Sequence, residues 1–362
     1  MRIAVVGSRG IESSYSGIER ILRELCPRLV GRGHSVDVFS ESKGDRRASP
    51  AGVGIVRVPS LAGQYTETLT RSGLSTLIGL WRGYDVMSFW AQGPGLFSLV
   101  TKLGRCRSVV SVQGLDWQRE KWPAAGRVAL RAAEATAVRC ADAITVASHG
   151  LERYFQERYR RQTVYIPNGT TVRPRACDAG PLAALGVEPQ GYLLFAARLV
   201  PEKGCHELIA AFNRLDTDRK LVVAGTGRYQ DGYVEELRGA ADPRRVIFAG
   251  HVEGALLEAL YAHAYLFVLP SHLEGQSLAL LEAMGHGTAA LVSDIPENRE
   301  VVGDAGLSFR VGDVADLRRR LARLSTDRDL VSRAAAQALE RVRLFDWERI
   351  TDAYERVFSA AR

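Results

Sequence analysis

Residues 270–287 read PSHLEGQSLALLEAMGHG, and this stretch places two carboxylates, Glu274 and Glu282, eight residues apart across one loop-to-helix junction. The preceding Tyr265–Leu269 has the apolar character of a short buried strand. Ser277–Met284 is apolar enough for a buried helix and is followed by glycines that end it. The stretch therefore predicts a strand, a polar turn and a helix in succession.

The start of that helix is a potential anion site. Ser277 is a suitable N-cap, the first helix amides lack intrahelical partners, and Gly275 lets the backbone approach a ligand closely. Carboxylates accept hydrogen bonds from sugar hydroxyls but repel phosphate, so both acids are expected to flank a diphosphate. The alternative is a surface acid at Glu274 and a solvated helix acid at Glu282. The apolar neighbours of Glu282 disfavour it, because an acid among them is costly unless it has a partner.

The run from Glu274 to Met284 resembles the Glu-Gly-x-x-Leu-x-x-Leu-Glu-Ala-Met motif of the retaining glycosyltransferases of family 4. The resemblance implies an α/β protein of the GT-B fold, in which two doubly wound Rossmann-like domains face a central cleft. It also implies that Glu274 meets hydroxyls of the donor sugar and that Glu282 meets the ribose hydroxyls of a nucleotide diphosphate sugar. The remaining donor-binding residues of this run are Gly275, Gln276, Ser277 and Leu278.

Composition and cysteine usage narrow the class of protein. A chain of 362 residues with 46% hydrophobic content can support two cores. The five cysteines are widely spread without C-x-x-C spacing, so we expect neither a disulfide framework nor a zinc site. The chain opens on an apolar strand without a charged leader, and no apolar run reaches the length of a membrane span. These features predict a cytoplasmic protein.

The charge is distributed unevenly. Residues 1–175 contain 26 Lys or Arg against 14 Asp or Glu, net +12, whereas the remainder contains 22 against 27, net −5. Such a bias is compatible with an ordinary arginine-rich surface, or with attraction to anionic lipid or to a partner that carries pyrophosphate. A nucleic-acid partner is not expected.

The first half alternates short apolar strands with helical stretches, which predicts a parallel sheet covered by helices on both faces. The turn Pro167-Asn168-Gly169 and the Pro-, Gly- and Ala-rich segment after it mark a domain boundary. We expect an acceptor-binding domain over 1–170, capped by a C-terminal helix at 346–362, and a nucleotide-sugar domain over 171–345. The expected strands of the first domain are Ile3–Val6, Val36–Phe39, Ile55–Val58, Val86–Phe89, Ser108–Val112, Ala143–Val146 and Thr163–Ile166.

Three turns of the second half carry further donor-site candidates. Arg198 and Lys203 stand five residues apart between a strand and a helix, where they could clamp a diphosphate or form surface salt bridges with Glu202 and Glu207. The resemblance favours the clamp. It also implies that the turn at Gly225 lines the cleft and that the backbone around Val252 meets the nucleobase.

The loop from Gly7 to Gly17 lacks G-x-G-x-x-G spacing, and no acid clearly closes the predicted second strand. A hydride-transfer Rossmann domain is therefore disfavoured. The resemblance assigns Gly17 to the donor diphosphate, although Ser16-Gly17 stands where the family usually has Gly-Gly.

A polar segment follows the predicted fifth strand, at the end where α/β folds bind ligands. It contains Gln113, Asp116 and Trp117, which we expect in an acceptor or sugar pocket. This segment resembles family members that build bacterial polysaccharides, including rhamnosyltransferases. Those relatives often carry His where this chain has Gln113, which can donate and accept but carries no charge.

The resemblance thus predicts sugar transfer, with retention of configuration, from a nucleotide diphosphate sugar to a glycan or lipid-linked glycan. Arg198, Lys203 and Glu274 are the expected catalytic residues. No metal is expected, because Arg198, Lys203 and the helix amides can offset the charge that develops on the leaving diphosphate, and no cofactor beyond the donor is needed. The alternatives are a nucleotide-sugar epimerase on the same fold and a non-catalytic nucleotide-sugar binding module. The basic first domain is expected to contact an anionic membrane peripherally.

Overall fold

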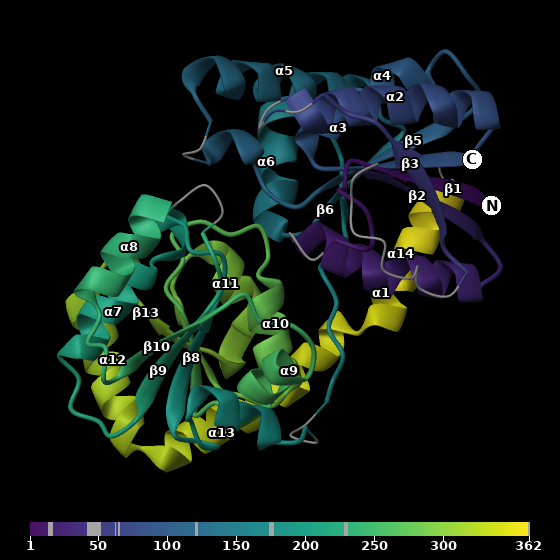
Figure 1. The fold of residues 1–362 in the computed structure, drawn as a ribbon. Helices are drawn as coiled ribbons and strands as arrows, with labels where there is room; N and C mark the ends of the chain where they lie inside the picture. The colour runs from purple at the N-terminus through teal and green to yellow at the C-terminus, as the bar shows by residue number, and fades with distance from the viewer. Residues whose placement is uncertain are drawn as a thin grey trace. The chain divides into compact units, whose positions relative to one another are not determined.

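The computed structural model describes residues 1–13, 17–41, 52–61, 63, 66–119, 122–173, 177–227 and 231–360. The chain divides into two compact units, unit 1 comprising Met1–Gly169 with Trp347–Arg362 and unit 2 comprising Thr170–Asp346 (Figure 1). Each unit contains one parallel sheet covered by helices, so the predicted pair of doubly wound α/β domains is confirmed.

Unit 1 has a seven-stranded sheet in the order β3-β2-β1-β4-β5-β6-β7. The central strands are buried on both faces, which explains why they are continuous apolar runs rather than alternating ones. All seven predicted strands are confirmed, with ends that differ by one or two residues. The strands are β1 Arg2–Val6, β2 Ser35–Glu41, β3 Gly54–Val58, β4 Val86–Trp90, β5 Arg107–Val112, β6 Ala143–Val146 and β7 Val164–Tyr165.

The end of β2 corrects one expectation. β2 continues two residues beyond the predicted Phe39, because Glu41 pairs with Val58 of β3 and its amide donates to the Arg9 carbonyl at 3.1 Å. An acid therefore does close the second strand, contrary to the prediction. The loop after β1 still lacks the glycine spacing of a dinucleotide fold.

Helices cover both faces of the unit 1 sheet, with α2, α3, α4 and α5 on one face and α1 and α14 on the other (Figure 1). The helices are α1 Gly17–Gly31, α2 Thr66–Arg82, α3 Gln92–Gly95, α4 Ser98–Thr101, α5 Ala124–Cys140, α6 His149–Tyr159 and α14 Trp347–Ala360, with a 3-10 turn η1 at Asp116–Gln118.

The C-terminal helix α14 packs within unit 1. Its apolar stripe is buried, and the Tyr354 ring lies 5.6 Å from the ring of Trp90 on β4. On its polar side, the Arg32 guanidinium contacts Glu348 at 2.8 Å and Glu355 at 3.0 Å. Helix α14 thus joins α1 through apolar packing and ion pairs.

Unit 2 has a six-stranded sheet in the order β10-β9-β8-β11-β12-β13. Two apolar layers cover it, one formed mainly with α7, α8 and α12 and the other with α9, α10 and α11, while α13 contributes to both. The short edge strand β13 was not among the predicted strands. The strands are β8 Tyr192–Ala196, β9 Lys220–Ala224, β10 Val246–Gly250, β11 Leu266–Leu269, β12 Ala290–Ser293 and β13 Leu307–Phe309. The helices are α7 Cys205–Asn213, α8 Asp231–Ala240, α9 Gly254–His263, α10 Leu278–Gly285, α11 Pro296–Val302, α12 Val314–Thr326 and α13 Arg328–Val342.

Candidate functional site

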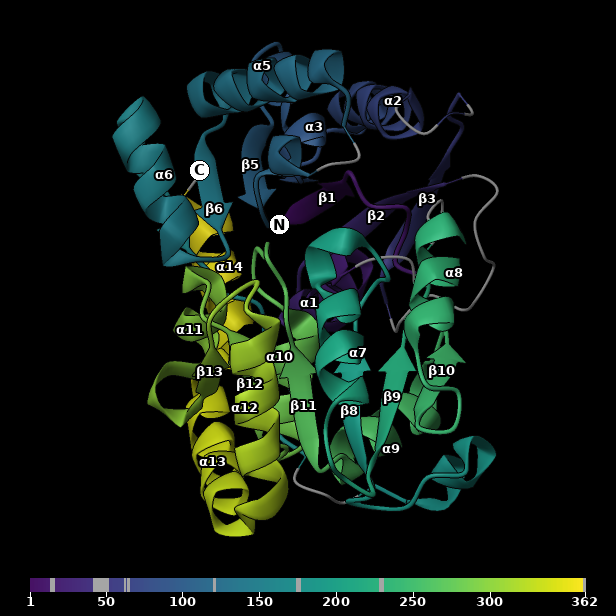
Figure 2. The same ribbon diagram turned by 90° about the vertical axis from the view of Figure 1, so that its left-hand side faces the viewer.

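The unit 2 sheet reverses its winding direction at its centre. From β8 the chain moves outward through β9 to β10, then returns to place β11 on the opposite side of β8. Figure 2 shows these strands side by side with their arrows pointing the same way. The loops after β8 and β11 therefore diverge at the carboxyl edge, which is where α/β sheets bind ligands.

Close backbone packing holds these two loops together. Gly204 has φ +67°, and a Cβ added there would lie 2.2 Å from the Pro270 carbonyl oxygen. The His272 amide donates to the Glu202 carbonyl oxygen at 2.9 Å. Only glycine fits position 204, because a side chain would meet both backbone strain and a clash.

A short ion pair joins the two loops. Lys203 Nζ lies 2.6 Å from Glu274 Oε1, and the two side chains are 12% and 7% exposed. The Ser271 hydroxyl donates to the same Glu274 oxygen at 2.7 Å. The structure thus brings together the cation and the acid that the sequence analysis had placed in separate loops.

Arg198 stands in the same loop as Lys203 with its side chain 40% exposed. Its Nη2 is 3.8 Å from Glu202 Oε1, so the first of the two alternative salt bridges forms at long range. Lys203 contacts Glu274 at 2.6 Å, and Glu207 contacts His272 Nε2 at 2.7 Å.

Helix α10 begins directly after the Glu274 turn. The Ser277 hydroxyl accepts from the Leu280 amide at 3.3 Å, which confirms Ser277 as the N-cap. Gln276 and Ser277 are buried, whereas Leu278 and Glu282 are half-buried. The amides at the helix start point back toward the preceding turn, as the geometry of any α-helix requires.

The turn after β9 packs against the loop after β8. Gly225 has φ +147°, and a Cβ there would lie 1.8 Å from the Ala197 carbonyl oxygen. Its amide donates to the Gly250 carbonyl at 2.7 Å, which links it to the turn that precedes Val252. The donor candidates of unit 2 therefore follow strands β8 to β11 at one edge of the sheet. These residues are Arg198, Lys203, Gly225, Val252, Glu274, Gly275, Gln276, Ser277, Leu278 and Glu282.

In unit 1, the candidates Gln113, Asp116 and Trp117 follow β5. All three are half-buried, and the Asp116 amide donates to Gln92 Oε1 at 2.9 Å. Within the part of the chain that the structure describes, the buried Gln113 Oε1 accepts no hydrogen bond. A buried acceptor without a donor is costly, and a bound hydroxyl would satisfy it.

Glu134, which the sequence analysis missed, organises this segment. Its carboxylate is 1% exposed and accepts from Trp117 Nε1 at 3.1 Å, from the Tyr154 and Tyr159 hydroxyls at 2.6 and 2.7 Å, and from Gln92 Nε2. Burial and the adjacent Glu134 charge raise the pKa of Tyr154. The available signal was the position of Glu134 on the buried stripe of an alanine-rich helix, where an acid needs donors.

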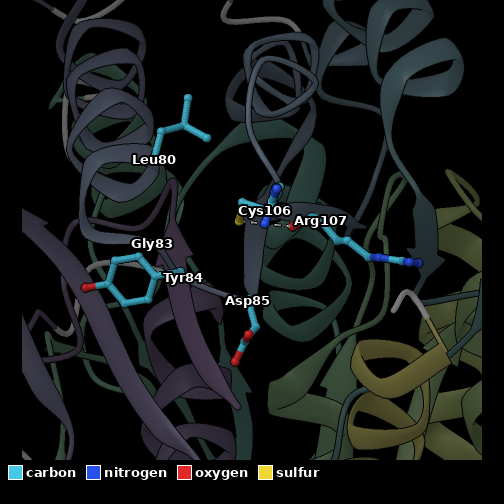
Figure 3. Close-up of a pocket in the computed structure, with 7 residues that line it drawn as sticks. Leu80, Gly83, Tyr84, Asp85, Cys106 and Arg107 are labelled. Atoms are coloured by element: carbon cyan, nitrogen blue, oxygen red, sulfur yellow. Dashed lines mark hydrogen bonds between the residues drawn. The ribbon is translucent and has the colours of Figure 1, made fainter.

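The last donor candidate, Gly17, begins α1 and is exposed, whereas Ser16 beside it lies outside the described residues. The described ranges contain no group of three His, Cys, Asp or Glu side chains arranged to hold a metal ion. A separate cavity of about 570 Å³ lies at the amino ends of β4 and β5, lined by Leu80, Gly83, Tyr84, Asp85, Arg105, Cys106 and Arg107 (Figure 3). This cavity is at the opposite edge of the unit 1 sheet from the candidate segment that follows β5.

Both halves of the chain match family models. Residues 16–169 match the glycosyl transferase 4-like domain, and residues 184–341 match glycosyl transferases group 1. Together the two matches cover most of the chain.

Three curated relatives share 32 to 36% identity with this chain over part of their length. The chain is 36% identical to the glycogen synthase of Mycobacterium tuberculosis over 176 residues, 47% of this chain and 42% of that protein. It is 32% identical to an O-antigen chain mannosyltransferase B of Escherichia coli, over 45% of this chain and 44% of that protein. It is also 32% identical to a phosphatidyl-myo-inositol mannosyltransferase of Mycolicibacterium smegmatis, over 57% of this chain and 54% of that protein. These alignments span about half the length of the curated relatives.

Solved structures match over nearly the whole chain. Sucrose-phosphate synthase from Thermosynechococcus elongatus superposes with a TM-score of 0.83 at 23% identity, covering 99% of each chain. HepE from Anabaena, in complex with UDP and glucose, gives a TM-score of 0.83 at 19% identity, and the match covers 99% of this chain and 100% of HepE. At these identities the likeness shows the fold. With two family models matched and this fold shared, the chain belongs to the glycosyltransferases of the GT-B fold, of the family 4 type.

Proposed function

We propose that this chain is a retaining, metal-independent glycosyltransferase that moves a sugar from a nucleotide diphosphate sugar to a hydroxyl of a glycan acceptor. The observation that carries the proposal is the Lys203–Glu274 pair at the switch point of unit 2, with Arg198 in the same loop and the start of α10 beside it. This constellation offers cations and helix amides for a diphosphate and a carboxylate for sugar hydroxyls.

In this proposal the cations stabilise the leaving diphosphate. As the bond between the sugar and the diphosphate breaks, Arg198, Lys203 and the α10 amides offset the charge that develops on the departing oxygen. The acceptor oxygen forms the new bond to the same sugar carbon, and its proton passes to that departing phosphate oxygen. Glu274 holds the sugar hydroxyls and Glu282 the ribose hydroxyls, and neither forms a covalent intermediate.

The relatives narrow the substrates that we propose. An O-antigen mannosyltransferase and a phosphatidyl-myo-inositol mannosyltransferase are among them, which supports a lipid-linked glycan acceptor at the cytoplasmic face of a membrane. HepE is described with UDP and glucose, which supports a uridine diphosphate sugar among the donors to test, beside guanosine diphosphate sugars and dTDP-rhamnose. We place acceptor recognition in unit 1, around Gln113, Asp116 and Trp117.

A thermal-shift panel of nucleotide diphosphate sugars tests the donor site, because a ligand of the native state raises the melting temperature. We expect one donor class to stabilise the wild type and the matched helical control Glu235→Gln, whose side chain is exposed on α8. Glu282→Gln should bind the same donor about 10- to 100-fold more weakly, since a charge-assisted hydrogen bond contributes about 1.5 to 3 kcal/mol. Equal donor affinity in all three proteins would contradict the role of Glu282, and no stabilisation by any donor would contradict the proposal itself.

A further inference from the structure

Helix α2 packs with its polar side inward. Arg71, Ser72, Ser75 and Thr76 are each at most 1% exposed, so this polar stripe faces the protein interior. In the described structure, the buried Ser72 and Ser75 hydroxyls have no hydrogen-bond partner. Burying unpaired hydroxyls is unfavourable, so the orientation of α2 is not explained by packing within unit 1.

The opposite side of α2 is apolar and exposed. Trp81 is 87% exposed, Leu77 58%, Leu69 41% and Leu74 37%. At 3.6 residues per turn Leu74, Leu77 and Trp81 share one stripe, opposite the buried polar residues, whereas Leu69 lies about 140° around the helix from Leu74. A surface helix of a globular protein normally buries its apolar stripe, so this exposed stripe indicates an apolar partner outside unit 1.

Helix α4 and the residue after it extend the same surface. Ser98 and Thr101 are buried, whereas Leu99 is 53% exposed and Leu103 is 86% exposed. A Cβ added at Gly104 would lie 2.8 Å from the Leu80 side chain, so the segment after α4 packs directly on α2. We call this surface the α2–α4 face, and it consists of Leu74, Leu77, Trp81, Leu99 and Leu103.

Basic residues surround the α2–α4 face. From the start of α2 to the end of α5 the chain has ten Lys or Arg and five Asp or Glu, and one of those acids, Glu134, is buried. Two of these cations, Arg105 and Arg107, line the cavity at the end of α2 together with Asp85, and Figure 3 shows Arg107 there. Exposed cations that adjoin the face are Arg82 at the end of α2 and Lys102 and Arg105 after α4, of which Lys102 also contacts Asp142 at 2.6 Å.

We infer that the α2–α4 face is the surface on which unit 1 docks to an anionic lipid bilayer. Leucine and tryptophan side chains would enter the boundary between headgroups and acyl chains, while the surrounding cations meet lipid phosphates. The positive charge favours a bilayer over an apolar protein surface, because anionic lipid supplies both the apolar and the negative component. This inference rests on the proposed function, in which the acceptor is lipid-linked.

Trp81 provides a direct reporter of docking. All five tryptophans lie in described segments, and the other four are buried or half-buried, so Trp81 is the one whose surroundings change when this face meets lipid. We expect phosphatidylglycerol vesicles to shift tryptophan emission to the blue at low salt and much less at high salt. Phosphatidylcholine vesicles should produce little shift. The same spectra recorded on Trp81→Phe should show no lipid-induced change.

Paired variants then test the face itself. The face variant, Leu77→Asp with Leu103→Asp, places two charges on the α2–α4 face and keeps Trp81. The control variant, Val164→Asp with Leu344→Asp, places two charges elsewhere on the surface, at apolar positions that are 42% and 47% exposed. In co-sedimentation with phosphatidylglycerol vesicles, we expect the face variant to bind at least tenfold more weakly than wild type and the control to bind as wild type does.

Three outcomes would overturn the inference: no vesicle binding by wild type, equal binding by both variants, or a wild-type dimer that the face variant abolishes in light scattering. The last result would assign the face to a second copy of the chain. Donor-induced thermal stabilisation should be the same in both variants. Its absence in every protein would count against the proposed function rather than against this face.

Discussion

Lys203 and Glu274 form the contact from which the proposed chemistry is argued, and Lys203 is the side chain to remove first. Lys203→Ala should lower kcat by about 10²- to 10³-fold, because a cation aimed at developing charge acts mainly in the transition state. Arg198→Ala should also lower kcat more than it weakens donor binding. The control Lys220→Ala removes a lysine at the amino end of β9, where Nζ donates to the Gly186 carbonyl at 2.9 Å. The measurements are steady-state kinetics and a separate assay of donor binding. If only donor affinity fell in the two variants, the proposed role of these cations in the transition state would be contradicted.

Glu134 is the residue whose removal should disturb the acceptor segment. In Glu134→Gln an amide replaces an oxygen that accepts from Trp117 and the tyrosines, so some buried donors lose their partner. We expect the free energy of unfolding to fall by about 1.5 to 3 kcal/mol and the KM for acceptor to rise more than that for donor. Glu157→Gln, exposed on α6, is the control. An unchanged ratio of the two KM values would leave Glu134 with a structural role alone.

Gly204 tests how closely the two donor loops must approach. Gly204→Ala forces a Cβ against the Pro270 carbonyl at φ +67°, so we expect lower stability and weaker donor binding. Gly239→Ala in α8 meets nothing within 4 Å and should raise stability by about 1 kcal/mol, as alanine favours a helix over glycine. Chemical denaturation of both variants is the measurement. Similar effects of the two changes would contradict the close approach.

At the level of single residues, the position of the unit 2 donor candidates at one edge of the sheet could be predicted, because the loops that follow parallel strands meet at that edge. The partners of those residues could not be predicted. The pairing of Lys203 with Glu274 depends on how two loops pack. Likewise, Glu134 accepts a hydrogen bond from Gln92, which is far away in the sequence. The resemblance supplied roles for residues, whereas contacts between segments came from the structure.

Helix α14 is held to α1 by ion pairs that make its docking sensitive to acid. Hydrogen bonds from Arg32 lower the pKa of Glu348, and those from His34 and Arg32 lower the pKa of Glu355, both below the ordinary 4.5. A carboxylate with a lower pKa in the folded state stabilises that state above its unfolded pKa. That contribution is lost as the pH falls through the folded pKa.

The melting temperature of Arg32→Gln therefore should lie below that of wild type at neutral pH, and the difference should shrink as the pH falls from about 5 toward 3. Calorimetry across this range is the measurement, and Arg356→Gln on the same helix is the control. A difference independent of pH would mean that Arg32 acts through packing rather than through its carboxylate partners.

At the level of helices and strands, some positions could be predicted from the sequence pattern and others could not. The buried strands were predicted to within one or two residues, since continuous apolar runs bounded by turns have few alternatives. Helix α2 carries both a polar and an apolar stripe, and tertiary packing places the polar stripe against the sheet, whereas a surface helix usually buries its apolar stripe. The edge strand β13 is three residues long, too short for a periodic signal.

At the level of the whole molecule, the division into two units follows from the number of apolar strands and the turn at Asn168-Gly169. None of the helices that the structure describes has the length and apolar character to cross a bilayer. Unit 2 carries the donor candidates after β8 to β11, and unit 1 carries Gly17, the proposed acceptor segment and the α2–α4 face.

Transfer of a labelled sugar is the most direct test. The purified chain is incubated with the nucleotide diphosphate sugar that stabilises it, and with lipid-linked oligosaccharides in vesicles or alkyl glycosides. We predict acceptor-dependent transfer with the anomeric configuration of the donor retained in the product, as read by NMR, and a large loss in Lys203→Ala. Isomerisation of the donor without acceptor, an inverted product, or no transfer of a donor that demonstrably binds would contradict the proposed function.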